Sequence, residues 1–256
     1  MKKLSYLFAL VVLLNACDSS TGESEKALSD VSGHWISRDY LITLDKTLSP
    51  QGVTEQFPFY ATEIILNNST PDSITIFNGQ IETFTLPFKR NGDTLSLKLN
   101  QDTVTQIIYN ASRKTLSFFD KSLNRTYTFI KAENGLIDQN VKPATAFQTA
   151  VNKTVLEGNW QIIDGDTTKT PLQFSRFGQI TGWDKYLTYT ICINGDCAAN
   201  EDGDIIILNN TNTSDEYGFR AKKDTLTFYK LTQRNDPDEK PVYQNGQALW
   251  VLVRKK

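Results

Sequence analysis

Short runs of apolar residues, or of alternating apolar and polar residues, recur along most of the chain. Segments such as 74–77, 94–99 and 225–229 are rich in Ile, Leu, Phe and Thr and have the twofold period of β-strands. Turn residues such as Asn78-Gly79 separate them. Strands this close together, without helices between them, predict antiparallel meanders that close into a barrel or a sandwich. Only residues 144–151 have a helical pattern, and that segment is short.

The two halves of the chain resemble each other. Three blocks occur in the same order in both halves, namely residues 32–35 and 157–160, 113–119 and 223–229, and 127–131 and 250–254. Because three ordered matches are hard to obtain by chance, we infer a tandem duplication. We therefore predict an all-β fold with two tandem small antiparallel β-barrels, over residues 31–131 and 153–256, joined by a linker over 132–152. Each barrel is expected to have its own core.

The N-terminus has the parts of an export signal. A short positive region precedes an apolar run over residues 4–14, which is too short to cross a bilayer of about 30 Å as a helix. The run ends in Leu14-Asn15-Ala16-Cys17, which resembles the lipobox of bacterial lipoproteins. The resemblance implies that residues 1–16 are a signal peptide and that Cys17 carries a diacylglyceryl anchor after cleavage.

Residues 17–30 are polar, acidic and almost free of bulky apolar side chains. Such a composition cannot bury enough apolar surface to fold, so this segment is predicted to be a flexible, lipidated tether. Acidic tethers directly after the cysteine resemble those of lipoproteins displayed by Bacteroidetes. The resemblance implies attachment to the outer membrane through the lipid, on either the periplasmic or the cell-surface face.

Each repeat opens with Gly-x-Trp and ends with a basic residue, which resembles the lipocalin-like (calycin) superfamily. In that superfamily the tryptophan plugs the closed end of the barrel and the cation packs over its ring. The resemblance therefore implies that Trp35 pairs with Lys131 and that Trp160 pairs with Arg254, each contact contributing about 0.5–2 kcal/mol. The repeats are shorter than a typical lipocalin, so their own side chains are able to fill the barrels.

Two further cysteines flank an Asn-Gly pair, in Cys192-Ile193-Asn194-Gly195-Asp196-Cys197. A two-residue type I′ hairpin places Cys192 and Cys197 opposite each other at a non-hydrogen-bonded position, within disulfide reach. An oxidising compartment outside the cytoplasm favours this bond. A metal-binding or redox-active pair is the alternative, but the sequence around the hairpin contains no histidine or second cysteine pair.

Charge and composition exclude several classes of function. Removing residues 1–16 takes away Lys2 and Lys3 and leaves 25 basic against 29 acidic residues, a net charge of −4. A mildly acidic chain without a basic run is a poor candidate for nucleic-acid binding. The single histidine, His34, lies inside the first Gly-x-Trp, and Asn159 takes its place in the second repeat. We therefore expect a surface or cap residue rather than a catalytic base.

Acidic residues cluster at 164–166, 201–204 and 236–239. None of these clusters has the spacing of an EF-hand, and Asp and Gly are the usual residues of turns, so we predict solvated turns rather than metal sites. Paired carboxylates for glycoside hydrolysis are an alternative that the sequence does not test. Since no nucleophile, phosphate-loop or zinc motif occurs, we predict a protein that is not an enzyme and has no cofactor.

These features lead to two hypotheses. In the first, the chain is a membrane-anchored binding module for an apolar small molecule or a glycan, bound at an open barrel end by aromatic residues such as Trp183, or Phe57, Phe59 and Tyr60. In the alternative, it is a non-catalytic accessory or structural subunit of an outer-membrane transport or assembly complex. An apolar cavity inside a barrel favours the first hypothesis, whereas filled barrels with exposed apolar patches favour the second.

Overall fold

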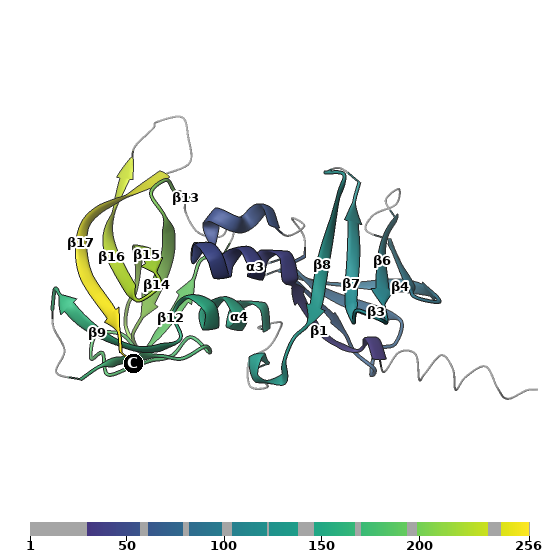
Figure 1. Cartoon of the computed structure of the whole chain (residues 1–256), viewed down its shortest axis with the longest axis horizontal. Coiled ribbons are helices and arrows are strands. Elements are labelled where there is room, and N and C mark those ends of the chain that lie inside the picture. The colour runs from purple at the N-terminus through teal and green to yellow at the C-terminus, as the bar shows by residue number, and fades with distance from the viewer. Residues whose placement is uncertain are drawn as a thin grey trace, which may run out of the picture.

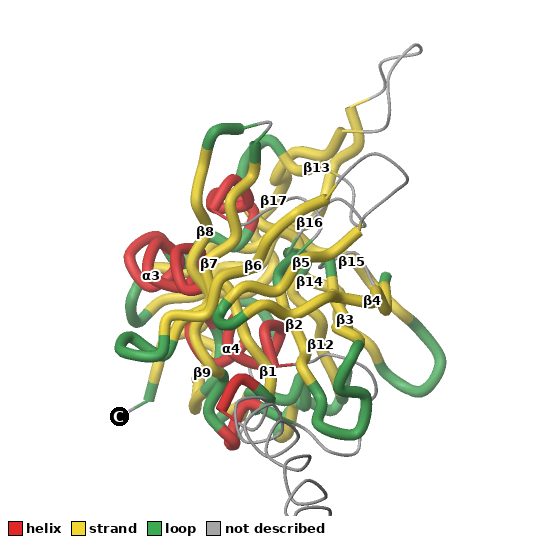
Figure 2. The backbone as a smooth tube through the Cα atoms, turned by 90° about the vertical axis from the view of Figure 1, so that its right-hand side faces the viewer, coloured by secondary structure: helices red, strands yellow, loops and turns green. Residues whose placement is uncertain are grey.

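The computed structural model describes residues 30–56, 61–78, 82–98, 104–121, 123–137, 146–166, 170–193, 199–234 and 242–255. These residues form two antiparallel β-barrels in tandem, with helices between them (Figure 1). Figure 2 looks along the line that joins the barrels, with the first barrel nearer the viewer. The predicted fold class, all-β with two tandem antiparallel barrels, is confirmed.

The first barrel is closed, because each strand pairs with the next along the chain and the last strand pairs with the first. Its strands are β1 (Gly33–Ser37), β2 (Glu63–Leu66), β3 (Ser73–Phe77), β4 (Thr83–Asn91), β5 (Thr94–Lys98), β6 (Val104–Asn110), β7 (Thr115–Asp120) and β8 (Arg125–Lys131). The strands alternate as their sequences predict. In β5, for example, Leu95 and Leu97 are buried and Lys98 is exposed.

The second barrel repeats this up-and-down order. Its strands are β9 (Gly158–Asp164), β10 (Leu172–Phe174), β11 (Ile180–Thr181), β12 (Thr188–Ile191), β14 (Asp204–Asn209), β15 (Ser214–Lys222), β16 (Thr225–Arg234) and β17 (Val242–Arg254), and β13 (Ala199–Asn200) pairs with β17 outside the barrel. Among the described residues, β11 and β12 are joined by a single isolated bridge, between Gln179 and Thr188. The second barrel is therefore nearly closed.

The strand registers match between the two barrels. Trp35 pairs with Lys131 across β1 and β8, and Trp160 pairs with Arg254 across β9 and β17. The neighbouring β7–β8 and β16–β17 pairs also have the same register relative to these cations. The structural repeat thus coincides with the repeat in the sequence, as a tandem duplication requires.

Helical segments lie between and beside the barrels: α3 (Arg38–Thr47), the 3₁₀ turns η2 (Gln51–Gln56) and η3 (Asn134–Leu136), and α4 (Ala146–Val155). The predicted helical segment 144–151 corresponds to α4. The expectation that no helix separates the strands is wrong, because α3 and η2 are inserted between β1 and β2. The α3 helix buries Tyr40 and Leu44, four residues apart on one face, and ends at Leu48 in the left-handed conformation.

Two hydrophobic clusters form the core, but they do not divide as two isolated barrels would. One cluster fills the first barrel around Trp35 and Phe129. The other extends from the second barrel through α4 to α3 and reaches Ile36 on the outer wall of the first barrel. Because the second core includes residues of both repeats, the two barrels are joined by continuous apolar packing.

Candidate functional site

One end of each barrel, here called the cap end, contains the buried tryptophan of the Gly-x-Trp motif. The side chains of Trp35 and Trp160 are fully buried. Each indole Nε1–H donates to the carbonyl oxygen four residues earlier, that of Val31 at 2.8 Å and that of Leu156 at 2.8 Å. Buried indoles usually find such a partner, and the same one serves in both repeats.

A cation covers each capping tryptophan. Lys131 Nζ lies 6.0 Å from the ring centroid of Trp35, and Arg254 Cζ lies 4.4 Å from that of Trp160. The structure therefore brings both predicted pairs together. Arg254 also donates from Nη1 to the carbonyl oxygen of Glu157 at 2.6 Å, so the second cap is tied to the backbone as well as to the ring.

The cation explains why each motif begins with glycine. Gly33 and Gly158 have φ values of +132° and +139°, which side chains rarely tolerate. A Cβ at Gly33 would lie 2.6 Å from Lys131 Cε, and one at Gly158 would lie 2.6 Å from Arg254 Nη1. Glycine thus provides both the backbone conformation and the space for the covering cation.

The opposite end of the second barrel, its far end, is covered by the loop 182–187 between β11 and β12. Trp183 is only 6% exposed, and its ring lies 5.2 Å from those of both Tyr186 and Trp250, edge to face. Trp183 therefore lies at a barrel end but is buried, not on the surface, because the loop turns this ring inward. Its part in ligand binding stays a prediction. A buried aromatic cluster fills this end.

Polar groups complete that cluster. The hydroxyl of Tyr186 donates to Asp215 Oδ2 at 2.9 Å and contacts the Tyr217 hydroxyl at 2.5 Å. Burial, together with these hydrogen bonds, raises the pKa of Tyr186 far above its usual range, so this phenol stays protonated. The ammonium of Lys185 lies over the rings of Tyr186 and Trp250, at 5.2 and 4.9 Å from their centroids.

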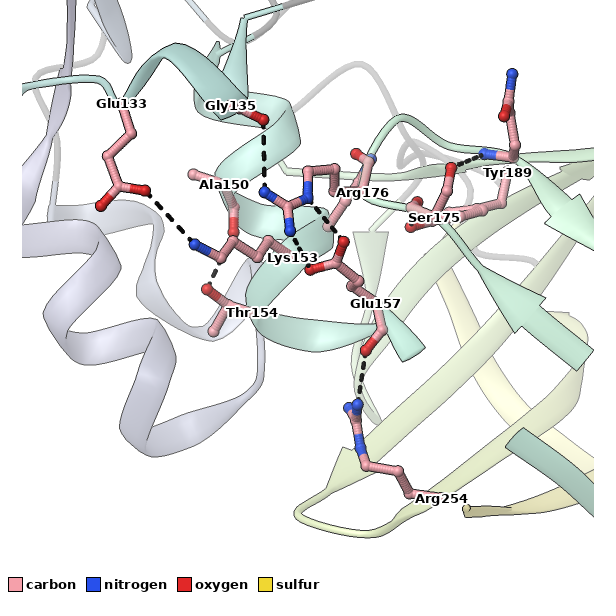
Figure 3. A network of polar contacts seen from close by, with 12 residues as sticks. Glu133, Gly135, Ala150, Lys153, Thr154, Glu157, Ser175, Arg176, Tyr189 and Arg254 are labelled. Atoms are coloured by element: carbon pink, nitrogen blue, oxygen red, sulfur yellow. Dashed lines mark hydrogen bonds and ion pairs between the residues drawn. The ribbon is translucent and has the colours of Figure 1, made fainter. Parts of the chain in front are cut away.

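A cleft of about 470 Å³ lies between the barrels, bounded by α3, β8, η3 and α4. Apolar and charged residues both line it, and they include Ile36, Leu41, Asp45, Ile130, Lys131, Glu133, Leu136, Ala150 and Lys153. Figure 3 shows one side of the rim, where Lys153 Nζ reaches toward Glu133 Oε2 at 3.7 Å.

A second group of contacts beside this rim ties the linker to the second barrel (Figure 3). Arg176 holds the carboxylate of Glu157 through two hydrogen bonds, Nε to Oε1 at 2.7 Å and Nη2 to Oε2 at 3.1 Å. Its Nη1 donates to the carbonyl oxygen of Gly135 at 3.5 Å. A bidentate arginine–carboxylate pair fixes direction as well as distance, so it sets the orientation of Arg176 toward Gly135.

A buried carboxylate of the first barrel binds the helix that leads into the second. Glu63, on the outer wall of β2, is fully buried. Its Oε2 accepts the backbone N–H of Phe147 in the first turn of α4 at 2.9 Å, and its Oε1 lies 2.6 Å from His34 Nδ1. The positive end of the helix favours a carboxylate at this position. His34, 25% exposed, therefore supports the contact between the barrels.

A buried carboxylate of the second barrel binds the insertion of the first. Asp204, at the start of β14, accepts the backbone N–H of Gln51 at 2.7 Å and the hydroxyl of Ser49 at 3.1 Å. Burial raises the pKa of Asp204 to about 6, although both hydrogen bonds oppose the shift. Each barrel thus contributes one buried carboxylate that accepts hydrogen bonds across the interface. The prediction of a solvated turn over 201–204 is wrong for Asp204, because this carboxylate is buried. No pattern singled out Glu63, although each of the two carboxylates opens a strongly apolar strand.

Several predicted site residues lie outside the described residues: Cys17, Phe57, Phe59, Tyr60 and Cys197. Cys192 is buried and disulfide-bonded. Its pairing with Cys197 stays a prediction.

The acidic clusters make protein contacts where they are described. Asp202 accepts the backbone N–H of Asn245 at 2.9 Å, and Glu201 accepts from Gln244 at 2.8 Å. Residues 236–239 lie outside the described part of the chain. The described residues contain no group of three or more His, Cys, Asp or Glu side chains placed to hold a metal ion. They also contain no helix long and apolar enough to cross a membrane.

Comparison with models of protein families, with curated proteins and with solved structures finds no match to this chain.

Proposed function

We propose that this chain is a lipid-anchored, non-catalytic docking subunit of an outer-membrane transport or assembly complex. In this proposal Cys17 carries the anchor, and residues 17–30 hold the folded body away from the membrane. The body of two barrels then presents a fixed surface to a partner. This proposal rests on the observation that both barrels are packed with their own side chains and joined by a shared core.

The packing of the barrels favours docking over carriage inside a barrel. Trp35 and Phe129 are fully buried within the first barrel, and Trp160, Phe219 and Phe228 within the second. A barrel of about eight strands has an interior just wide enough for such side chains. A ligand in either interior would have to displace them.

The interface between the barrels supports a body that acts as a single unit. A flexible pair of domains usually meets through a small, polar surface. Here the apolar cluster runs without interruption from Ile36 through Tyr40 and Phe147 to Trp160. Glu63 and Asp204 then fix the alignment with hydrogen bonds in both directions. Such a body is suited to hold a partner in one orientation.

A second candidate function is the binding module, in which the chain holds an apolar small molecule or a glycan. The observation that favours it is the cleft between α3 and α4, whose volume of about 470 Å³ suits a small ligand. In this alternative the site lies between the barrels, not in a barrel interior.

Native mass spectrometry of the chain without residues 1–17, purified from a bacterial host without detergent, distinguishes the two functions. The docking function predicts a bare protein at its calculated mass. A reproducible additional mass of lipid or glycan size, lost on denaturation, would support the binding module instead.

Site-specific cross-linking in cells tests the docking function directly. A photoreactive amino acid at Asp45 or Lys153, both exposed on the cleft rim, is expected to give one discrete adduct with an outer-membrane protein. The same probe at Lys222, exposed at the end of β15, is the matched control. Identical adducts from all three positions, or none from the cleft, would contradict docking through the cleft.

A further inference from the structure

The far end of the second barrel contains a corner made by two aromatic rings. The rings of Tyr186 and Trp250 are nearly perpendicular, at 82°, with their centroids 6.4 Å apart. Lys185 Nζ lies over both rings, 5.2 Å from the first centroid and 4.9 Å from the second. A cation within about 6 Å of a ring face is attracted by the ring quadrupole, so the corner is a formed cation site.

The first barrel has an equivalent pair, but its cation is anchored. Tyr127 corresponds to Trp250, because each lies four residues before the capping cation of its repeat. Arg125 Cζ lies 5.0 Å from the ring centroid of Tyr127. Its guanidinium also donates to the carbonyl oxygen of Glu55 at 2.8 Å and to the side-chain oxygen of Gln56 at 2.5 Å. These hydrogen bonds fix Arg125 in place.

Lys185 has no such anchor. Its side chain is exposed, and within the described part of the chain its ammonium makes ring contacts but no hydrogen bond or ion pair. Its backbone, in contrast, is held, since its carbonyl oxygen accepts from Asn210 Nδ2 at 3.2 Å. The ammonium can therefore leave the corner while the loop stays in place.

The chemistry of the corner selects the kind of cation. A primary ammonium has three N–H donors, and the described wall of the corner offers ring faces to it. The hydroxyl of Tyr186 is already engaged with Asp215 and Tyr217. A trimethylammonium group has no N–H, so it loses no hydrogen bond when aromatic faces replace water around it. The carboxylate of Asp215, which accepts from the Tyr186 hydroxyl, adds negative charge near the corner.

We propose that this corner is a subsite for a trimethylammonium group, as in choline or a choline-type headgroup, and that Lys185 is its exchangeable internal occupant. A ligand cation replaces the lysine ammonium over Tyr186 and Trp250. The competing side chain is tethered, so it lowers the apparent affinity for the ligand without abolishing binding.

Tryptophan fluorescence reports binding, because Trp183 and Trp250 both lie in the cluster. The full chain in a non-ionic detergent is titrated with choline, with glycerophosphocholine, and with the neutral isostere 3,3-dimethylbutan-1-ol. The variants are Lys185→Ala and the control Lys222→Ala, both at exposed lysines. A third, Lys185→Ala combined with Trp250→Phe, keeps an aromatic ring but presents a weaker face to the cation.

Saturable choline binding is expected in the wild type, about fivefold tighter in Lys185→Ala, and unchanged in Lys222→Ala. The isostere should bind Lys185→Ala about tenfold more weakly than choline, and Trp250→Phe should weaken choline binding several-fold. Equal binding of glycerophosphocholine would point to a lipid headgroup as the source, and binding of choline alone to the free cation. Absence of saturable binding, equal binding of the isostere, or binding confined to Lys185→Ala would each overturn the proposal.

Discussion

The two barrels share strand order, register and cap, and they differ in their loops and far ends. The first barrel closes completely and carries α3 and η2 between its first two strands. In the second barrel the matching connection runs from Asp164 to Leu172 and contains no described helix, and the seam between β11 and β12 is held by a single described bridge. The loop 182–187 then seals the second barrel with aromatic side chains.

The two barrels therefore agree in the strands and the cap and differ in the connecting loops. The cap, built from a glycine, a tryptophan and a cation, is present in both copies. The loops are free to change, because they are not part of the strand ladder. In the first copy the changed loop builds the interface with its neighbour, and in the second it builds the aromatic corner.

The largest expected effect comes from removing a cap. Trp160→Ala and Trp35→Ala should each lower the free energy of unfolding by about 3–5 kcal/mol, since a large buried side chain leaves a cavity. The two changes should destabilise different parts of the molecule, because Trp160 belongs to the core shared with α3 and Trp35 belongs to the core of the first barrel alone. Hydrogen exchange should therefore speed up in α3 after the Trp160 change. Equal exchange in α3 for both variants would break the distinction between the two cores.

The next largest expected effect is a pH dependence of the folding stability, caused by Asp204 at the interface between the barrels. Burial raises the pKa of Asp204 from 3.8 to about 6, so the folded chain binds this proton more tightly than the unfolded chain. The resulting stabilisation is complete below about pH 4 and is lost as the pH rises through about 6, a difference of about 3 kcal/mol.

Asp204→Asn should remove this pH dependence. The amide oxygen can still accept from Gln51 and Ser49, and no charge has to be desolvated, so the variant should be more stable than the wild type at pH 7. Denaturant unfolding at pH 4.5 and pH 7 measures the difference. Asp184→Asn, at an exposed carboxylate, controls for net charge. An unchanged pH slope in Asp204→Asn would show that another group is responsible.

A smaller effect is expected at the motif glycines. Gly33→Ala and Gly158→Ala should each cost about 1–3 kcal/mol, because alanine is strained at these φ values and its Cβ meets the covering cation. The second change should cost more, since Arg254 is held by Glu157 and yields less easily than the lysine stem. Gly135→Ala, where a Cβ meets an ordinary contact at 3.6 Å, is the control in thermal unfolding. Equal losses of stability at all three positions would show that the motif glycines are no more constrained than an ordinary glycine.

The sequence predicted the parts of this fold that repeat. Strand alternation, the Gly-x-Trp blocks and the closing cations are local patterns, and they led to two barrels with the correct capping pairs. Helix α3 was missed because its segment, Arg38–Thr47, contains β-branched residues and buries only Tyr40 and Leu44. Its helical state depends on packing between the barrels, which no local pattern records.

The interface and the aromatic corner could not be predicted for a related reason. Glu63 and Asp204 are each the first residue of a strand, and only the tertiary structure places a backbone N–H from a distant segment against them, that of Phe147 in α4 and that of Gln51 in η2. Trp183 lies among turn residues, which favoured an exposed position. Its ring turns inward to pack against Tyr186 and Trp250, which are distant from each other in the sequence, so no local pattern indicates its burial.

The smallest expected effect is the difference in stability cost between removing the cation of one cap and removing that of the other. Replacing the cation by methionine keeps the apolar stem over the ring and removes the charge. Arg254→Met should cost about 1–2 kcal/mol, because the guanidinium lies 4.4 Å from the ring of Trp160 and also binds the backbone of Glu157. Lys131→Met should cost about 0.5 kcal/mol or less, because its ammonium is exposed and lies 6.0 Å away, near the limit of the interaction. Urea unfolding of both variants gives the comparison. Equal losses of unfolding free energy would mean that the apolar stems of the two side chains, and not their charges, stabilise the caps. The role of the motif glycine would then be to leave space for the stem.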